Sequence, residues 1–237
     1  MALYRDEGVV LRTVKLGEAD RIITLFTRGH GKVRAVAKGV RRTKSRFGGR
    51  LEPFMRVDVL IAEGRTLDVI SQAESIAAYA ASICTDYEAY MAAGVIAETA
   101  DRLTGTEGEA AVDQYRLLIA ALHALAIHAH PPQSISDSYV LRALSLAGWT
   151  PRLDSCVVCG HDENLSYLSI PAGGVMCDSD RTPEARPLNP TERLQLRALA
   201  HGDWKTLADV APVSRVTRLV GDWGEYYLER PLRSMRI

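Results

Sequence analysis

The stretch RIITLFTRGHGKVRAVAK, residues 21–38, decides the fold of the first part of this sequence. Apolar side chains recur at every second position on both sides of a central Gly-His-Gly, which is the pattern of two half-buried strands. Glycine tolerates the positive φ angles of a tight hairpin. We therefore expect residues 21–28 and 32–38 to pair through the turn at residues 29–31.

The same alternation extends on both sides of this hairpin. It predicts five short strands, at residues 7–15, 21–28, 32–38, 54–62 and 66–72. A five-stranded unit of this size suits a small closed barrel of the OB type or a small sandwich. We favour the barrel because closure removes the exposed edges that so small a sheet would present. An OB-fold domain is thus expected over residues 1–80.

From residue 75 onward the apolar spacing becomes helical and alanine dominates. Helices are predicted at residues 75–83, 86–104, 110–130 and 136–147, followed by a non-helical insert and further helices that resume at Asn189 and end with residues 214–229. The expected fold class is α+β and multidomain. A five-stranded OB-fold barrel is followed by an α-helical domain, residues 81–237, that carries a zinc-ribbon-like insert at about residues 150–188.

Charge is distributed unevenly along the chain although the formal net charge is zero. Residues 1–80 hold fifteen Lys and Arg against nine Asp and Glu, and the remainder holds fourteen against twenty. Ten cations lie between Arg21 and Arg50 without one acid. Such a block favours a polyanion-binding surface over an ordinary solvated loop. The predicted phosphate contacts are Arg28, Lys32, Arg34, Lys38, Arg41, Arg42, Lys44, Arg46 and Arg50.

Few aromatic side chains accompany these cations, so affinity should come mainly from phosphate neutralisation. Phe47 lies within the block. It either stacks on a base or anchors the segment in the core, and both readings stay open here.

Two cysteine motifs lie in the insert, CVVCGHDE and GGVMCDSD. Their spacing is that of a zinc ribbon whose last position is an aspartate, so the predicted ligands are Cys156, Cys159, Cys177 and Asp180. His161 is an alternative fourth ligand. We rank it below Asp180 because it follows Cys159 too closely in the sequence to bind the same ion easily. A metal-free insert with reduced thiols or a disulfide, and a catalytic rather than structural zinc, remain alternatives.

No enzyme motif is visible in the chain: a P-loop, a dinucleotide fingerprint, a nucleophile elbow and HExxH are all missing from the sequence. Glu98 and Asp101 are expected on a solvated helix face, and Cys84 is expected to be buried. No signal peptide and no membrane span are predicted, and we expect a cytoplasmic protein.

Several stretches carry a resemblance to a known family. EGVVLRTVKLGEADRIITLFTRGHGKVRAVAKGVRRTKSRFGGRLEPF, LRALSLAGWTPRLDSCVVCG with GGVMCDSD, and YYLERPLRSMRI resemble the family of the bacterial recombination mediator RecO along nearly the whole chain. The chain departs from the family pattern at Asp180, where many members have a fourth cysteine.

The resemblance implies a non-enzymatic DNA-repair protein. It implies binding to single- and double-stranded DNA, ATP-independent annealing, and a zinc module, in which we expect one structural zinc ion. It also implies the partners RecR and the C-terminal tail of the single-strand binding protein SSB, with loading of RecA as the indirect result, and a place in the cytoplasm near the nucleoid. Two other functions stay open, a zinc-dependent nucleic-acid enzyme and an RNA-binding OB protein.

Overall fold

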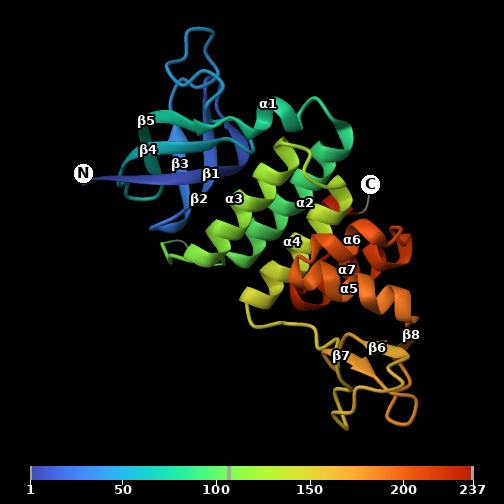
Figure 1. Ribbon diagram of the computed structural model, residues 1–237. Coiled ribbons are helices and arrows are strands. Elements are labelled where there is room, and N and C mark those ends of the chain that lie inside the picture. Colours follow the sequence, from blue (N-terminus) through green and yellow to red (C-terminus); the bar gives the residue numbers. More distant parts are fainter. Residues whose placement is uncertain (1, 106–107, 236–237) are drawn as a thin grey trace. The chain divides into compact units, whose positions relative to one another are not determined.

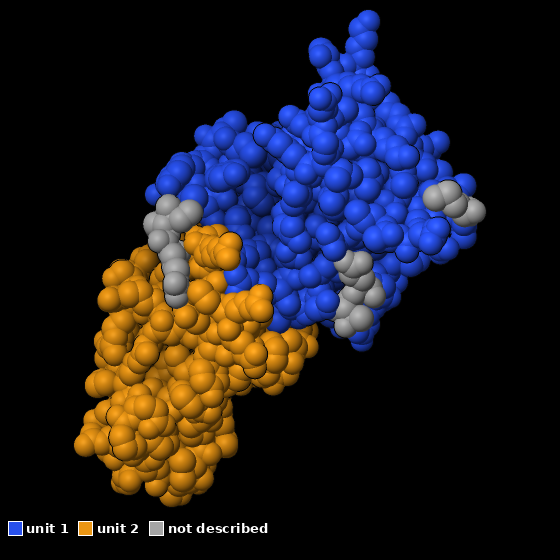
Figure 2. Space-filling view, turned by 180° about the vertical axis from the view of Figure 1, so that it is seen from behind, with its two compact units in different colours: residues 1–129 blue, residues 130–237 orange. Residues whose placement is uncertain are grey.

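The computed structural model describes residues 2–105 and 108–235. The chain folds into two compact units, residues 1–129 and residues 130–237 (Figure 2). The first unit contains the strands predicted for the barrel and three helices, and the second contains the remaining helices and the cysteine-bearing insert (Figure 1). The domain boundary that we predict at residue 80 follows the end of the barrel and stays a prediction.

The first unit is built on a closed five-stranded barrel, as the alternation of its strands predicts. The strands follow one another around the barrel in the order β1-β2-β3-β5-β4, and only β3 and β5 run parallel. Their bounds are β1 Leu3–Leu16, β2 Asp20–Thr27, β3 Gly31–Ala37, β4 Arg56–Ala62 and β5 Asp68–Ala77. Inward side chains such as Ile23, Ala35 and Val59 are fully buried and fill the interior.

The predicted Gly-His-Gly turn is confirmed, and its second glycine has a definite role. Gly31 has φ +61°, and a Cβ placed there would lie 1.9 Å from the carbonyl oxygen of Glu109. Any larger residue would displace the segment that follows the second helix, so only glycine fits. The break predicted at residues 104–109 includes residues 106 and 107, which lie outside the described residues.

One strand runs further than its sequence pattern predicts. We expect a helix from residue 75, but Ser75 pairs with Val57 and Ala77 with Arg56 at the end of β5. Ladder hydrogen bonds to β4 override the helix preference of the alanines in this segment.

Three helices complete the first unit, α1 Tyr79–Ile83, α2 Tyr87–Leu103 and α3 Val112–Ala126. The carboxylate of Asp86 accepts hydrogen bonds from the backbone N–H groups of Glu88 and Ala89 and caps α2. The ring of Tyr115 on α3 meets the ring of Phe26 on β2 edge-on, with centroids 5.9 Å apart. Helix α3 therefore covers the outer face of β2 near Phe26, at the C-terminal end of the strand.

The second unit is helical apart from one small sheet. Its elements are α4 Pro132–Leu146, β6 Tyr167–Ser169, β7 Gly174–Met176, β8 Arg186–Pro187, α5 Pro190–His201, α6 Trp204–Asp209, α7 Ser214–Tyr227 and the 3₁₀ helix η1 Arg233–Met235. Asn189 caps α5 as predicted, in a reciprocal capping box with Glu192. Among the described residues, no helix combines the length and apolar character needed to cross a membrane.

Candidate nucleic-acid interface and metal cluster

The long connection between β3 and β4, residues 38–55, is named the basic loop below. It consists of consecutive turns and extends from the barrel in Figure 1. Four of its side chains belong to the barrel core, namely Val40, Phe47, Leu51 and Met55. Phe47 is only 1% exposed, so it anchors the loop and does not present its ring to a ligand. The loop is thus held to the barrel by apolar contacts at several points along its length.

Six cations lie on the basic loop and all are exposed, namely Lys38, Arg41, Arg42, Lys44, Arg46 and Arg50. In the part of the chain that the structure describes, none of the six pairs with a carboxylate. The contacts of Arg41 and Arg50 go to backbone carbonyl oxygens, and the guanidinium of Arg46 lies 4.9 Å from the centre of the Phe47 ring. Their positive charges are therefore not offset by neighbouring acids.

Arg41 also joins the basic loop to the hairpin between β1 and β2. Its guanidinium donates to the carbonyl oxygens of Gly17 and Glu18, and its backbone N–H donates to that of Ala19. Next to it, the N–H of Gly39 donates to a carboxylate oxygen of Asp20 over 2.7 Å. Two connections that are separate in the sequence thus form one continuous surface at this end of the barrel.

Of the other predicted phosphate contacts, Lys32 and Arg34 lie on β3 and Arg28 lies in the turn between β2 and β3. Arg34 is exposed on β3. Arg28 forms an ion pair with Glu7 at 3.4 Å, and Lys32, whose side chain is 14% exposed, forms one with Asp101 at 2.9 Å. The charges of Arg28 and Lys32 are thus offset within the unit, whereas those of the basic loop are not.

Asp101 corrects one prediction from the sequence. We expect it on a solvated face, but it is half-buried between Lys32 and Arg12, with Arg12 Nε 2.9 Å from its carboxylate. Burial acts to raise the pKa of Asp101, yet the two cations outweigh burial and the pKa is lowered. This carboxylate therefore ties helix α2 to strands β1 and β3.

The predicted metal ligands come together in the second unit. The ligand atoms of Cys156, Cys159, Cys177 and Asp180 all lie within 4.8 Å of one another. The sulfurs of Cys159 and Cys177 are 3.9 Å apart, and Asp180 Oδ2 is 3.6 Å from the sulfur of Cys156 and 3.2 Å from that of Cys177. In a tetrahedral zinc site with bonds of about 2.3 Å, two sulfurs lie about 3.8 Å apart. The cluster could therefore hold a metal ion.

The fourth position of the cluster belongs to Asp180. His161 contributes its backbone instead, since its carbonyl oxygen accepts the N–H of Cys156 over 2.7 Å. All four cysteines are free thiols, which leaves no disulfide in the insert. Cys84 is exposed rather than buried, because it follows the last turn of the short helix α1 instead of facing the core.

Backbone geometry brings the cysteines to one place. Gly160, after the second cysteine, has φ +79°, and its N–H donates to the carbonyl of Cys156. A Cβ on Gly174 would lie 2.2 Å from the carbonyl oxygen of Arg152, so the two segments can pair only when residue 174 is glycine.

Hydrogen bonding lowers the pKa of the Cys156 thiol. Burial acts to raise this pKa, but N–H donors from Cys159 and Cys177 outweigh burial and lower the pKa to about 7. The thiolate that a metal requires is thereby favoured at Cys156, whereas the hydrogen bond with Asp180 raises the pKa of Cys159.

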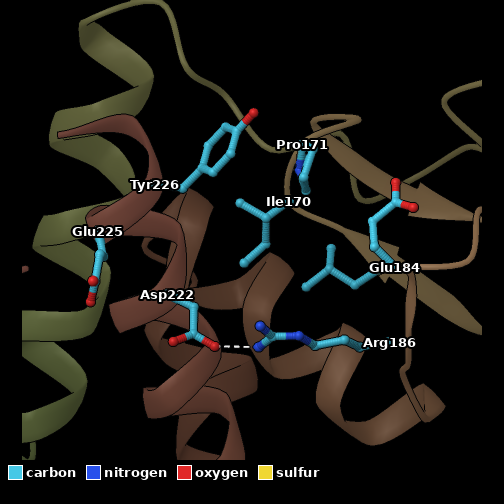
Figure 3. A pocket seen from close by; sticks show the side chains of 8 residues that line it. Ile170, Pro171, Glu184, Arg186, Asp222, Glu225 and Tyr226 are labelled. Atoms are coloured by element: carbon cyan, nitrogen blue, oxygen red, sulfur yellow. Dashed lines mark hydrogen bonds and ion pairs between the residues drawn. The ribbon is translucent and has the colours of Figure 1, made fainter. Parts of the chain in front are cut away.

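A pocket of about 400 Å³ lies between the small sheet and helix α7 (Figure 3). Leu168, Ile170 and Pro171 form its apolar wall, and Arg186 forms an ion pair with Asp222 at its edge. No cysteine, serine, threonine or histidine is among its lining residues. Its ionisable lining residues are Glu184, Arg186, Asp222, Glu225 and Tyr226.

Comparison with known proteins identifies the family. Residues 1–79 match the family model described as Recombination protein O N terminal, and residues 84–236 match Recombination protein O C terminal. This chain belongs to the RecO family. The RecO family consists of DNA repair proteins and is not a family of catalysts.

Three proteins named DNA repair protein RecO illustrate the similarity, and each is matched over 100% of this chain. The protein of Bifidobacterium longum subsp. infantis is 69% identical over 99% of its own length, that of Bifidobacterium adolescentis is 66% identical over 99%, and that of Streptomyces avermitilis is 47% identical over 98%.

Proposed function

We propose that this chain is a DNA repair and recombination mediator that binds single- and double-stranded DNA and anneals complementary strands without ATP. In this proposal it acts with RecR, contacts the C-terminal tail of SSB, and assists loading of RecA onto SSB-coated single strands near the nucleoid. The partners rest on membership of the RecO family. DNA binding rests, in addition, on the charges of the chain itself.

The observation that carries the proposal is the exposure of the six basic-loop cations and their lack of neighbouring carboxylates among the described residues. The loop that bears these cations is anchored in the core. A fixed set of uncompensated cations binds phosphates without reading sequence. It also lowers the repulsion between two strands, which is what annealing without ATP requires.

For the cluster in the insert we propose one structural zinc ion, held by Cys156, Cys159, Cys177 and Asp180. Three soft sulfur donors and one carboxylate form an acceptable zinc set, and all four positions are filled by the protein. A closed donor set supports a structural rather than a catalytic ion.

The basic loop is tested by the double variant Arg42→Gln/Lys44→Gln. The logarithm of the DNA affinity falls with the logarithm of salt, with a slope of about −0.9 per neutralised phosphate, so we expect the slope to become shallower by about two units. The matched control is Arg5→Gln/Arg116→Gln. It removes the same charge from two exposed residues of the same unit that already have carboxylate partners.

Fluorescence anisotropy over a salt series measures both slopes, and equal slopes for the two variants would exclude the basic loop. Annealing of SSB-coated complementary strands without nucleotide tests the wider proposal. A strong preference for RNA over DNA in competition would instead support the RNA-binding alternative.

A further inference from the structure

The pocket between the small sheet and helix α7 combines an apolar wall with a charged rim. Leu168 and Ile170 are 3% and 8% exposed and form the inner part of the wall. Glu184 and Tyr226 also line the pocket but are exposed, and Figure 3 shows the side chain of Ile170 between them. The pocket lies within the second unit and brings together an apolar surface, a carboxylate and an aromatic ring.

Contacts of Tyr227 hold the two sides of this pocket together. Its hydroxyl donates to the carbonyl oxygen of Ile170 over 3.3 Å, which ties α7 to the residues that follow β6. Its ring stacks on that of Trp149, with centroids 5.6 Å apart, and stands nearly perpendicular to the ring of Tyr226. Neighbouring rings thus fix the position of Tyr226 at the rim, so the pocket is formed before a ligand arrives.

The charges on the rim are unevenly compensated. Arg186 is the guanidinium among the described lining residues, and it forms an ion pair with Asp222. Glu184 forms no ion pair within residues 2–105 and 108–235. Hydrogen bonds, first of all from the hydroxyl of Thr182, lower the pKa of Glu184, so its carboxylate is ionised at neutral pH. A negative charge without a cationic partner thus lies beside the apolar wall and the ring of Tyr226.

These features together select the chemistry of an occupant. A carboxylate binds a guanidinium or ammonium group by charge-assisted hydrogen bonds, and the face of a tyrosine ring attracts the same cations. The apolar wall accepts the aliphatic stem of such a side chain and an apolar neighbour. Because Pro171, Glu184 and Tyr226 are all exposed, the rim is open, whereas sites for small molecules bury most of their ligand. The occupant is therefore a side chain that projects from a larger molecule.

We propose that this pocket binds an arginine or lysine side chain, with an adjoining apolar residue, from an exposed segment of a partner protein. A segment that carries carboxylates instead would be repelled by Glu184. The pocket lies in the second unit and the basic loop in the first, so binding at this pocket does not depend on the proposed DNA binding.

The test measures binding of the full chain to three labelled peptides by fluorescence anisotropy. The cationic probe is Gly-Ile-Arg-Ile-Gly, blocked at both ends. The other two probes replace its arginine with citrulline, which has the same shape without the charge, or with glutamate. We expect the arginine peptide to bind about fivefold more tightly than the citrulline peptide, the upper end of the contribution of an exposed ion pair.

Two variants assign this preference to the pocket. Glu184→Gln should weaken binding of the arginine peptide about fivefold and leave the citrulline peptide unchanged. Tyr226→Leu keeps an apolar side chain but removes the ring face, and should weaken binding of the arginine peptide about threefold. The matched control is Glu163→Gln, because Glu163 is an exposed acid of the insert that does not line the pocket. It should leave all three affinities unchanged, and circular dichroism should show that all three variants are folded.

Four results would overturn the assignment of a cationic segment to this pocket. The first is an arginine peptide that does not bind, or that binds no more tightly than the citrulline peptide. The second is equal weakening by Glu184→Gln and Glu163→Gln. The third is tighter binding of the glutamate peptide to Glu184→Gln than to the wild type, which would place an acidic segment in the pocket. The fourth is displacement of the arginine peptide by an equal concentration of free arginine, which would assign the pocket to a small molecule.

Discussion

The basic loop and the cysteine insert are both long segments with little regular structure, but they are held in different ways. The basic loop places Val40, Phe47, Leu51 and Met55 in the core of the barrel. The insert is organised around three sulfurs and one carboxylate on a small sheet. A loop can thus be fixed by side chains that share an existing core, whereas the insert brings together four side chains that could hold a metal ion.

The largest effect is expected from removing a metal ligand. Cys177→Ser should abolish stoichiometric zinc binding and unfold residues 150–188. The reason is that metal binding contributes about 10 kcal/mol or more to the folding free energy of small zinc modules. Elemental analysis gives the metal content, and limited proteolysis reports whether the insert is folded. The matched control is Cys84→Ser, since Cys84 is an exposed thiol outside the cluster.

The same variant tests whether the two regions are independent, because the basic loop contains no residue of the cluster. Cys177→Ser should leave the salt dependence of duplex binding unchanged. A wild-type chain without stoichiometric metal would refute the zinc proposal. Loss of DNA binding in the variant would show that the two regions are not independent.

The next effect is expected from removing the main apolar anchor of the basic loop. Phe47→Ala leaves a cavity in the barrel core and should destabilise the first unit by about 3–5 kcal/mol. All three tryptophans, Trp149, Trp204 and Trp223, lie in the second unit, so their fluorescence should report an unchanged transition. Hydrogen exchange of the barrel strands measures the loss. Unchanged protection of those strands would contradict the anchoring role.

A smaller effect is expected from a buried acid in the second unit. Asp137 is 2% exposed and accepts hydrogen bonds from Gln133 and Thr217. Burial raises its pKa to about 6 despite these donors. Because the folded pKa lies above the unfolded one, its contribution to stability is complete below about pH 4 and is lost as the pH rises through 6.

Asp137→Asn should therefore stabilise the second unit at pH 8, by at most about 3 kcal/mol, and have little effect near pH 4. The asparagine oxygen can accept from Gln133 while its NH₂ donates to Thr217. Urea unfolding followed by tryptophan fluorescence at both pH values measures the difference. The same change in stability at pH 4 and pH 8 would show that ionisation of Asp137 is not its cause.

Local patterns allowed the barrel, the helical second half and the clustering of three cysteines with Asp180 to be predicted, because each depends on short spacings. The period-two runs around Gly29 and Gly31 identified the strands, and the two cysteine motifs identified the cluster. Ion pairing could not be predicted in this way. Asp101 and Lys32 are far apart in the sequence, and only the folded barrel brings them together.

The anchors of the basic loop have a signal in the sequence. Phe47, Leu51 and Met55 recur every four residues inside a segment otherwise rich in cations and glycine. Such regular apolar spacing indicates one buried side even where no helix forms. The end of β5 cannot be predicted from local sequence for another reason, since alanine-rich sequence favours a helix until a neighbouring strand offers ladder hydrogen bonds.

The attachment of the basic loop has a consequence for the conformational entropy that is lost when a ligand binds. Ordering a flexible segment opposes association by about 1–2 kcal/mol per residue in conformational entropy. Here the four core side chains and the Arg41 contacts with the β1–β2 hairpin restrict the backbone when the barrel folds. A polyanion then meets cations already in position, and its arrival requires little further loss of chain freedom.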